Sequence, residues 1–360
     1  MLVRDFDFQL PPELIAQEPP PDRGGARLLH MTRVPGATTH AHVTDLPRLL
    51  RPGDLLVVND TRVFPARLLG HRAPSGGAVE CLLIGPAAPD GAPVGEARSG
   101  AEQWWDALVH PGQKLKPGAR VRFGGSMDLW GEILERRHFG RRIVRLWTEA
   151  GGTVDEAIEA IGHVPLPPYI KRADSRADRE RYQTVFAERS GSVAAPTAGL
   201  HFSDGLVAAL QAAGVTVVSV TLHVGYGTFQ PIRVDVVEEH VLETEPYTIS
   251  AGTAEAIAKA RRDGRRVIAV GTTTTRTLEA VAREHDGEVV PGEGRTNLFI
   301  YPGFDFRVIS GLMTNFHLPQ SSLLMLVSAF AGTERVLSAY RAAIAERYRF
   351  YSYGDAMLIT

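Results

Sequence analysis

The chain has 360 residues, 44% of them hydrophobic and 22% charged, which is the composition of an ordinary folded globular protein and excludes fibrous and disordered classes. The length favours roughly two domains. The formal net charge of -2 gives no overall basic field for a nucleic-acid partner, and the single cysteine, Cys81, excludes an internal disulfide and a cysteine-based metal cluster.

The N-terminal residues 1–7 lack the charged start and the apolar stretch of a secretory signal. No stretch reaches the roughly 18 uninterrupted apolar residues that a membrane helix requires. The nearest candidate, residues 323–331, is short and ends at Gly332. We therefore expect a soluble, cytoplasmic protein with no membrane partner.

The first 62 residues contain one clear apolar strand, at 54–59, and too little material for a core of their own. Between Gly70 and Gly152 the chain is rich in Gly and Pro, and short segments alternate with period two, which indicates the strands of a small sheet or barrel. The expected strands are 79–84, 105–109, 119–123, 129–134 and 143–147, and residues 86–100 are expected to form a mobile loop.

After Gly152 the pattern changes to helices that alternate with strands. Asp204 is expected to cap a helix before a strand at 215–223, and Ser250 to cap another before a strand at 266–271. Residues 272–275 lead into a further helix, and apolar residues recur at helical spacing in 334–349.

This alternation predicts an α/β fold. We expect a large α/β catalytic domain with a mostly parallel sheet, formed by residues 1–62 and 152–360. A small β-barrel-like insert, residues 63–151, interrupts it.

Common nucleotide-binding and hydrolase motifs are missing. The chain has no Walker A sequence, no His-Glu-x-x-His, no Gly-x-Ser-x-Gly and no Gly-x-Gly-x-x-Gly after a strand. Instead, polar clusters follow the predicted strands, where α/β sheets bind ligands.

The first cluster, residues 58–62, follows a strand directly. Asn59 could line a crevice, Asp60 could act as a base and Arg62 could hold an anion, although a turn with an Asp–Arg ion pair explains the same residues.

Two further clusters combine small and ring-bearing residues. In residues 194–202, Thr197 and Gly199 allow a ligand close to the backbone and His201 can titrate, although a structural histidine fits equally well. In residues 222–229, Gly225, Tyr226, Gly227 and Phe229 suggest a tight loop with aromatic rings for stacking, with a plain β-turn as the alternative.

The last two clusters lie before helices. Residues 270–276 present hydroxyls and backbone N–H groups to an anion, with Thr272, Thr273 and Arg276 as candidates and simple helix capping as the alternative. Residues 313–319 bring Asn315, Phe316 and His317 together, and so many polar groups in a core turn would need partners.

Two local basic runs could contact RNA phosphates despite the neutral total charge. The second run also contains acidic residues, so a solvated mixed-charge face is its alternative. The candidates are Arg136, Arg137, Arg141 and Arg142 in the first run, and Lys171 and Arg172 in the second.

Six blocks closely resemble the S-adenosylmethionine:tRNA ribosyltransferase-isomerase family of queuosine biosynthesis. They occur in order from one end of the chain to the other, and the likeness is weakest in the insert. The blocks are residues 10–17, 53–63, 191–202, 223–229, 314–319 and 353–359.

The resemblance implies that S-adenosylmethionine is a cosubstrate whose ribosyl group, and not its methyl group, is transferred and isomerised. The acceptor is 7-aminomethyl-7-deazaguanine (preQ1) at the wobble position of a tRNA with a GUN anticodon, and the products are epoxyqueuosine-tRNA, adenine and methionine. The resemblance further implies a two-domain monomer with no metal and no tightly bound cofactor.

Such a reaction needs a base for the acidified C5′ hydrogens and an acid for the departing adenine. Thr272 to Thr275 and Arg276 are candidates for holding the methionine carboxylate or a phosphate, and Tyr226, Phe229 or Phe316 for stacking on a base. The candidates for acid and base, with no proton assigned to any one of them, are His201, His223, His317, Asp60 and Asp355.

Two other functions remain open on residues alone. A methyltransferase would release S-adenosylhomocysteine in place of adenine and methionine. A noncatalytic tRNA-binding protein would leave S-adenosylmethionine unconsumed, and the polar clusters argue against it.

Overall fold

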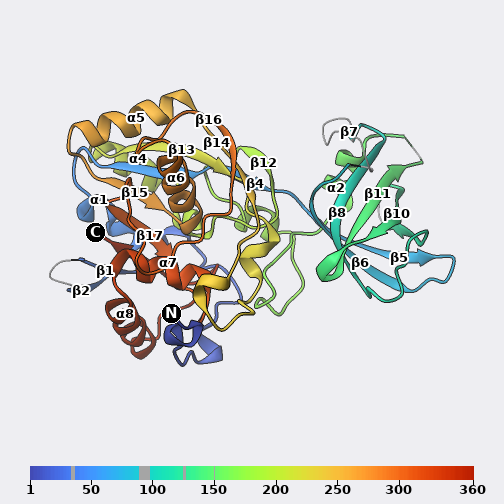
Figure 1. Ribbon diagram of the computed structural model, residues 1–360, viewed down its shortest axis with the longest axis horizontal. Helices are drawn as coiled ribbons and strands as arrows, with labels where there is room; N and C mark the ends of the chain where they lie inside the picture. Colours follow the sequence, from blue (N-terminus) through green and yellow to red (C-terminus); the bar gives the residue numbers. More distant parts are fainter. Residues whose placement is uncertain (34–36, 89–97, 125–126, 150) are drawn as a thin grey trace.

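A computed structural model describes residues 1–33, 37–88, 98–124, 127–149 and 151–360. The chain forms two lobes (Figure 1). The larger lobe is α/β and is built from both ends of the chain, whereas the smaller lobe is a β-barrel built from its middle. The predicted fold class is confirmed.

The larger lobe contains a nine-stranded mixed sheet in the order β16-β14-β13-β3-β15-β17-β18-β1-β2. Its four central strands, β13, β3, β15 and β17, are parallel, while antiparallel pairs predominate toward the edges. The strands are β1 (Arg27–Met31), β2 (Thr38–His42), β3 (Leu55–Asn59), β13 (Thr216–Leu222), β14 (Glu245–Ile249), β15 (Val267–Val270), β16 (Gly292–Thr296), β17 (Gly311–Asn315) and β18 (Ala356–Ile359).

Helices cover both faces of this sheet, which is why its central strands are apolar throughout. In β3, Leu55 and Val57 belong to the core on one face, and Leu56 and Val58 to the core on the other. The helices are α1 (Leu46–Leu49), α3 (Asp178–Arg181), α4 (Asp204–Ala212), α5 (Ala251–Arg262), α6 (Thr272–Glu284), α7 (Ser322–Ala331) and α8 (Thr333–Ala345).

Serine caps start three of these helices. Ser203, Ser250 and Ser321 each accept a hydrogen bond from the backbone N–H three residues later, an arrangement worth about 1 kcal/mol per cap. The prediction for Ser250 is confirmed. The predicted cap Asp204 is wrong, because Ser203 caps α4 and Asp204 is its first helical residue.

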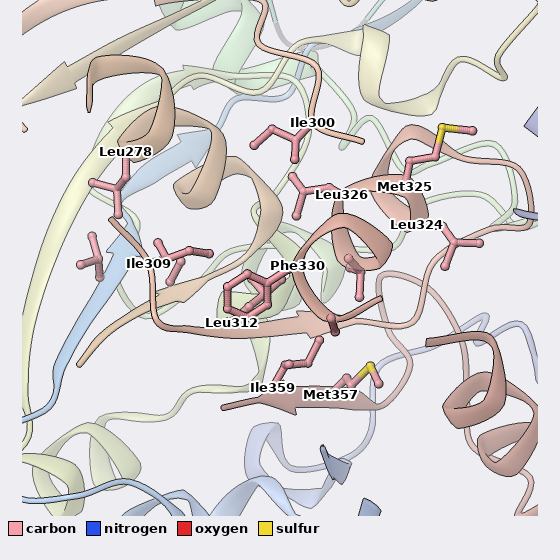
Figure 2. Close-up of a cluster of buried hydrophobic side chains, with 14 of the residues drawn as sticks. Leu278, Ile300, Ile309, Leu312, Leu324, Met325, Leu326, Phe330, Met357 and Ile359 are labelled. Carbon is pink, nitrogen blue, oxygen red and sulfur yellow. The ribbon is translucent and has the colours of Figure 1, made fainter. Parts of the chain in front are cut away.

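The core beneath α7 fixes the end of the sheet that carries the polar clusters. Figure 2 shows Leu324, Met325, Leu326 and Phe330 of α7 among side chains of β17, β18 and α6. Among the described residues no single helix is long and apolar enough to span a membrane; α7 and α8 together reach that length but are bent by 114°.

The smaller lobe is a six-stranded barrel in the order β11-β10-β9-β5-β6-β8, closed by pairing of β11 with β8, with β7 added beside β8. Its core also contains Val154, Ala157 and Ile158 of α2 (Val154–Ile161), so this helix packs on the barrel. The strands are β5 (Arg67–Ala73), β6 (Ala78–Pro86), β7 (Arg98–Ser99), β8 (Glu102–His110), β9 (Arg120–Phe123), β10 (Leu129–Arg136) and β11 (Arg141–Thr148).

Five of these strands were expected, and β5 and β7 were not. Gly70 interrupts the apolar pattern of β5, and it packs so closely on β9 that a Cβ atom there would lie 2.5 Å from the carbonyl oxygen of Arg122. The expected mobile loop at 86–100 falls largely outside the described residues.

Candidate active site

A cavity of about 550 Å³ opens where β13, β15 and β17 end. Each strand is followed by lining residues: Val224 after β13, Thr272 and Thr273 after β15, and Asn315 at the end of β17. The 3-10 helix η6 (Thr197–His201) and residues 351–352 complete the wall. The cavity therefore lies at the carboxyl edge of the parallel strands, as expected for an α/β sheet.

Two helices begin at this cavity. Thr272 and Thr273 start α6, and Ser321 and Ser322 cap and start α7, and all four residues line the wall. Free backbone N–H groups and the positive end of the helix dipole favour an anion there. Among the predicted hydroxyls, those of Thr274 and Thr275 instead donate to backbone carbonyls of the preceding turn.

Asn315 is held in one orientation by three partners. Its Oδ1 accepts from the Thr197 hydroxyl at 3.0 Å, while its Nδ2 donates to the Tyr351 carbonyl and to His201 Nε2, both at 3.1 Å. A buried amide with all these bonds made is a rigid part of the wall. Predicted residues Thr197 and Asn315 thus meet directly.

His201 and His317 are both buried and neutral. Burial, together with the charge of Arg349, lowers the pKa of His201 to about 4. Burial lowers the pKa of His317 to about 3. His317 lines the cavity, with its Nε2 2.8 Å from the Thr314 hydroxyl, whereas His201 lies behind Asn315 and positions it.

His223 lies outside the lining of the cavity. Its Nδ1 is 2.8 Å from the Thr61 hydroxyl, and burial lowers its pKa. Gly191 packs on the imidazole: with φ at 147°, a Cβ atom there would lie 3.0 Å from the ring. His223 is therefore locked into the wall of the lobe.

Neither predicted carboxylate lines the cavity. Asp60 accepts from the hydroxyls of Ser219 and Thr221 at 2.8 and 2.6 Å. Asp355 accepts from the backbone N–H groups of Arg27 and Arg349 at 2.9 and 2.7 Å. The oxygens of both carboxylates are engaged within the fold, and the catalytic roles of Asp60 and Asp355 stay predictions that the geometry of the cavity does not support.

Arg276, predicted to hold an anion, lies in a buried ion pair and not in the lining of the cavity. Its guanidinium donates to the Glu245 carboxylate at 2.6 Å and to the Leu298 carbonyl at 2.9 Å, and both charged groups are buried. Glu245 in turn accepts from the Gly225 N–H at 2.8 Å. This buried ion pair therefore fixes the loop that begins at Gly225.

Two other predicted ligand-binding residues support the site from outside the cavity. Asn59 donates to the Leu222 carbonyl at 3.0 Å and to the Thr273 hydroxyl at 3.4 Å. Gly199 packs on Thr184, where a Cβ atom would lie 2.8 Å from the methyl group. Arg62 is exposed on β4 (Thr61–Val63), and Gly227 packs on Glu243.

The aromatic candidates separate in space. Phe316 is fully buried against Tyr340 and Phe350, so it cannot stack on a ligand. Tyr226 lines a second cleft of about 500 Å³, which adjoins the first cavity because Pro168 lines both. The side chain of Phe229 lies outside the described residues.

Most of the predicted RNA-binding arginines are engaged. Arg142 is buried and donates to the carbonyls of Gly112 and Leu115, and Arg141 bridges Asp106 and Glu243.

Arg137 pairs with Glu135 and Arg172 with Asp178, which leaves Arg136 and Lys171 as exposed candidates. Some carboxylates that pair with these arginines, such as Asp106 with Arg141, come from other parts of the fold. A count of basic residues along the sequence therefore does not show which arginines are already paired.

Several lining residues were not predicted. They include Tyr169, Gln320, Tyr351 and Ser352, which lie in irregular segments, and Ser321, which caps α7. Gln320 has a left-handed φ of 57°, a conformation that non-glycine residues adopt where the surroundings enforce it. Among the described residues, no group of three or more His, Cys, Asp or Glu is placed to hold a metal ion.

The fold and the cavity define an α/β protein with an inserted β-barrel and a ligand site at the carboxyl edge of its sheet. The model of the queuosine biosynthesis protein family matches residues 3–359, and the chain belongs to this family. The resemblance seen in the sequence blocks is confirmed.

Relatives match over the whole chain. Two proteins named S-adenosylmethionine:tRNA ribosyltransferase-isomerase, from Heliobacterium modesticaldum and Solibacter usitatus, are each 51% identical, with 100% of both chains covered. A crystal structure of S-adenosylmethionine tRNA ribosyltransferase from Thermotoga maritima is 37% identical, covers 99% of this chain and 100% of its own, and superimposes with a TM-score of 0.55.

Proposed function

We propose that this chain is an S-adenosylmethionine:tRNA ribosyltransferase-isomerase. It transfers the ribosyl group of S-adenosylmethionine to preQ1 at the wobble position of a tRNA with a GUN anticodon and isomerises it. The products are epoxyqueuosine-tRNA, adenine and methionine. The observation that carries the proposal is the family match over residues 3–359.

The cavity at the sheet edge suits S-adenosylmethionine. Its volume of about 550 Å³ lies within the range of small-molecule sites, roughly 300–1,000 Å³. In this proposal the methionine carboxylate binds at the starts of α6 and α7, where Thr272, Thr273 and Ser321 offer hydroxyl and backbone N–H donors. Asn315 and Thr197, which are hydrogen-bonded to each other, line the part of the cavity that would hold the remainder of S-adenosylmethionine.

His317 takes part in the reaction as a hydrogen-bond acceptor or base. Burial lowers the pKa of its imidazole to about 3, so the ring is neutral near pH 7 and is not a cationic acid for the departing adenine. Its Nε2 is oriented by Thr314, and the ring borders the cavity. We therefore assign His317 a hydrogen-bonding role toward the substrate, with proton abstraction as the alternative.

The tRNA enters through the second cleft. This cleft joins the cavity at Pro168 and presents the ring of Tyr226 and the exposed side chain of Lys171 to an incoming nucleotide. The proposal includes a monomeric protein that works in the cytoplasm, and light scattering of the purified chain tests the monomer.

Incubation with S-adenosylmethionine and tRNA that carries preQ1, followed by mass analysis of nucleosides and small molecules, tests the function. We expect epoxyqueuosine with equal amounts of adenine and methionine. S-adenosylhomocysteine would identify a methyltransferase instead, and unconsumed S-adenosylmethionine would identify a noncatalytic tRNA-binding protein.

The His317→Ala variant should lower turnover by roughly 100-fold or more, the usual contribution of a proton-transfer group, while the fold is retained. His285→Ala is the matched control, because His285 is exposed at the far end of α6. Near-normal turnover of a folded His317→Ala protein would remove His317 from the mechanism.

A further inference from the structure

The barrel carries a basic groove at the end of β5 that faces away from the α/β lobe. β5 begins beside the connection to the α/β lobe, where Arg67 pairs with His163, and ends at Ala73 on the outer side of the barrel (Figure 1). There Arg72, Lys114, Lys116 and Arg120 border a groove of about 590 Å³. Among the described residues, none that lines this groove is a carboxylate.

The positive charges of this groove are not neutralised locally. In the part of the chain that the structure describes, Lys114, Lys116 and Arg120 are exposed and form no ion pair. Arg72 is fixed by hydrogen bonds from its guanidinium to the Ser75 hydroxyl at 2.7 Å and to the Lys114 carbonyl at 3.1 Å.

Two acids beside this groove, at and next to β10, are already paired. Asp128 binds Arg122 at 2.7 Å, and Glu132 binds Arg145 at 2.6 Å. The groove therefore keeps an excess of positive charge that attracts a polyanion.

An aromatic platform borders the same groove. Trp130 of β10 lies nearly parallel to Trp147 of β11, with an interplanar angle of 15° and ring centroids 6.3 Å apart. The guanidinium of Arg122 on β9 lies 5.9 Å from the Trp130 ring. Small β-barrels bind single-stranded nucleic acid with this combination of cations and aromatic rings. The phosphates pair with the cations, and the bases stack on the rings.

We propose that this barrel groove binds the phosphate backbone of the substrate tRNA at a distance from the reacting nucleotide. The inference rests on the proposed function for the identity of the RNA. A contact of this kind is independent of sequence, so it adds affinity for every tRNA and leaves the chemistry at the sheet edge unchanged.

Binding of unmodified tRNA at several salt concentrations tests the groove. The Lys114→Gln/Lys116→Gln variant should weaken binding by roughly 10-fold near physiological salt and reduce the slope of log affinity against log salt by about 1 to 2. The matched control is Lys259→Gln/Arg262→Gln, which removes two exposed charges from α5 on the α/β lobe. An affinity and slope equal to those of the control would overturn the proposal.

Turnover separates this inference from the proposed function. With saturating tRNA the Lys114→Gln/Lys116→Gln variant should keep the wild-type kcat and the KM for S-adenosylmethionine, while the KM for tRNA rises. A wild-type chain without ribosyl transfer would refute the proposed function but not the groove. Wild-type turnover with an unchanged KM for tRNA in the variant would refute the groove alone.

Trp130 provides a second measurement. Trp130→Ala should weaken tRNA binding by about 10-fold, the usual loss of one stacked base, whereas Trp130→Phe should retain most of the affinity. Equal tRNA affinity of the folded alanine and phenylalanine variants would exclude stacking on this platform.

Discussion

The two buried histidines should make the α/β lobe acid-sensitive. Both His201 and His317 have folded-state pKa values far below the ordinary value of 6.5, at about 4 and about 3. The unfolded chain therefore binds protons more readily than the folded chain below pH 6.5. Stability from these residues is present above pH 6.5 and is lost as the pH falls toward 4 for His201 and toward 3 for His317.

The magnitude follows from the linkage relation. At pH 5 each unfolded histidine is almost fully protonated and each folded one is almost fully neutral, so each contributes about 2 kcal/mol less stability than at pH 7. Together they should lower the unfolding free energy of the lobe by about 4 kcal/mol between pH 7 and pH 5. Because both side chains are less than 10% exposed, solvent screens little of this effect.

Urea unfolding at a series of pH values measures the loss, and the two lobes can be followed separately. All four tryptophans lie in barrel strands, and all nine tyrosines lie outside them. Tyrosine circular dichroism therefore follows the α/β lobe, and selectively excited tryptophan fluorescence follows the barrel. The tyrosine transition should shift with pH through His201 and His317, and the tryptophan transition provides an internal reference.

Single variants assign the effect. His317→Asn should remove about 2 kcal/mol of the pH dependence of the tyrosine transition, because one of the two most strongly shifted imidazoles is gone. A tyrosine transition that keeps the same urea midpoint from pH 7 to pH 5 would refute the reasoning, since it would mean that the folded lobe protonates both histidines freely.

Two further variants test packing around the site. Arg276→Met leaves the buried Glu245 carboxylate without its counter-ion and should lower the free energy of unfolding in urea by about 3–5 kcal/mol. The double variant with Glu245→Gln should regain part of this loss. A loss below about 1 kcal/mol would contradict the buried ion pair. Gly191→Ala adds a Cβ atom 3.0 Å from the His223 ring and should destabilise by about 1–3 kcal/mol, whereas the control Gly252→Ala meets no atom within 4 Å and should be neutral or slightly stabilising.

Much of the architecture was predictable because its signals are local. The strands β3, β13 and β15 are apolar on both faces and stand between helix-forming segments, so each was located to within a residue or two. The closure of the barrel was harder to predict from the sequence. It depends on β8 pairing with β11, strands far apart in the chain, and on β5, whose apolar pattern is broken by Gly70.

The site was predictable where polar residues directly follow central strands. Thr272, Thr273, Asn315 and His317 were candidates on that ground, and all four line the cavity; Thr197, chosen for the small residues around it, lines it too. The sequence does not show whether a polar side chain faces a ligand or another residue of the protein.

Arg276 and Asp355 have the residue types that bind substrates, yet both are engaged within the lobe. Glu245, the partner of Arg276, and Arg27, one of the partners of Asp355, come from other segments of the chain, whereas Arg349 lies six residues before Asp355.

The same distinction applies to the two basic runs. In the run 136–142 the arginines lie close to carboxylates and carbonyls of neighbouring strands, so Arg141 and Arg142 are engaged within the protein. The barrel groove arises in the opposite way: Arg72, Lys114 and Arg120 come from three segments, none of which is a basic run. Strand pairing brings Arg72 and Arg120 to one end of the barrel, and Glu132, which lies opposite Arg120, is paired with Arg145. A chain with a net charge of -2 thus still carries a positive groove there.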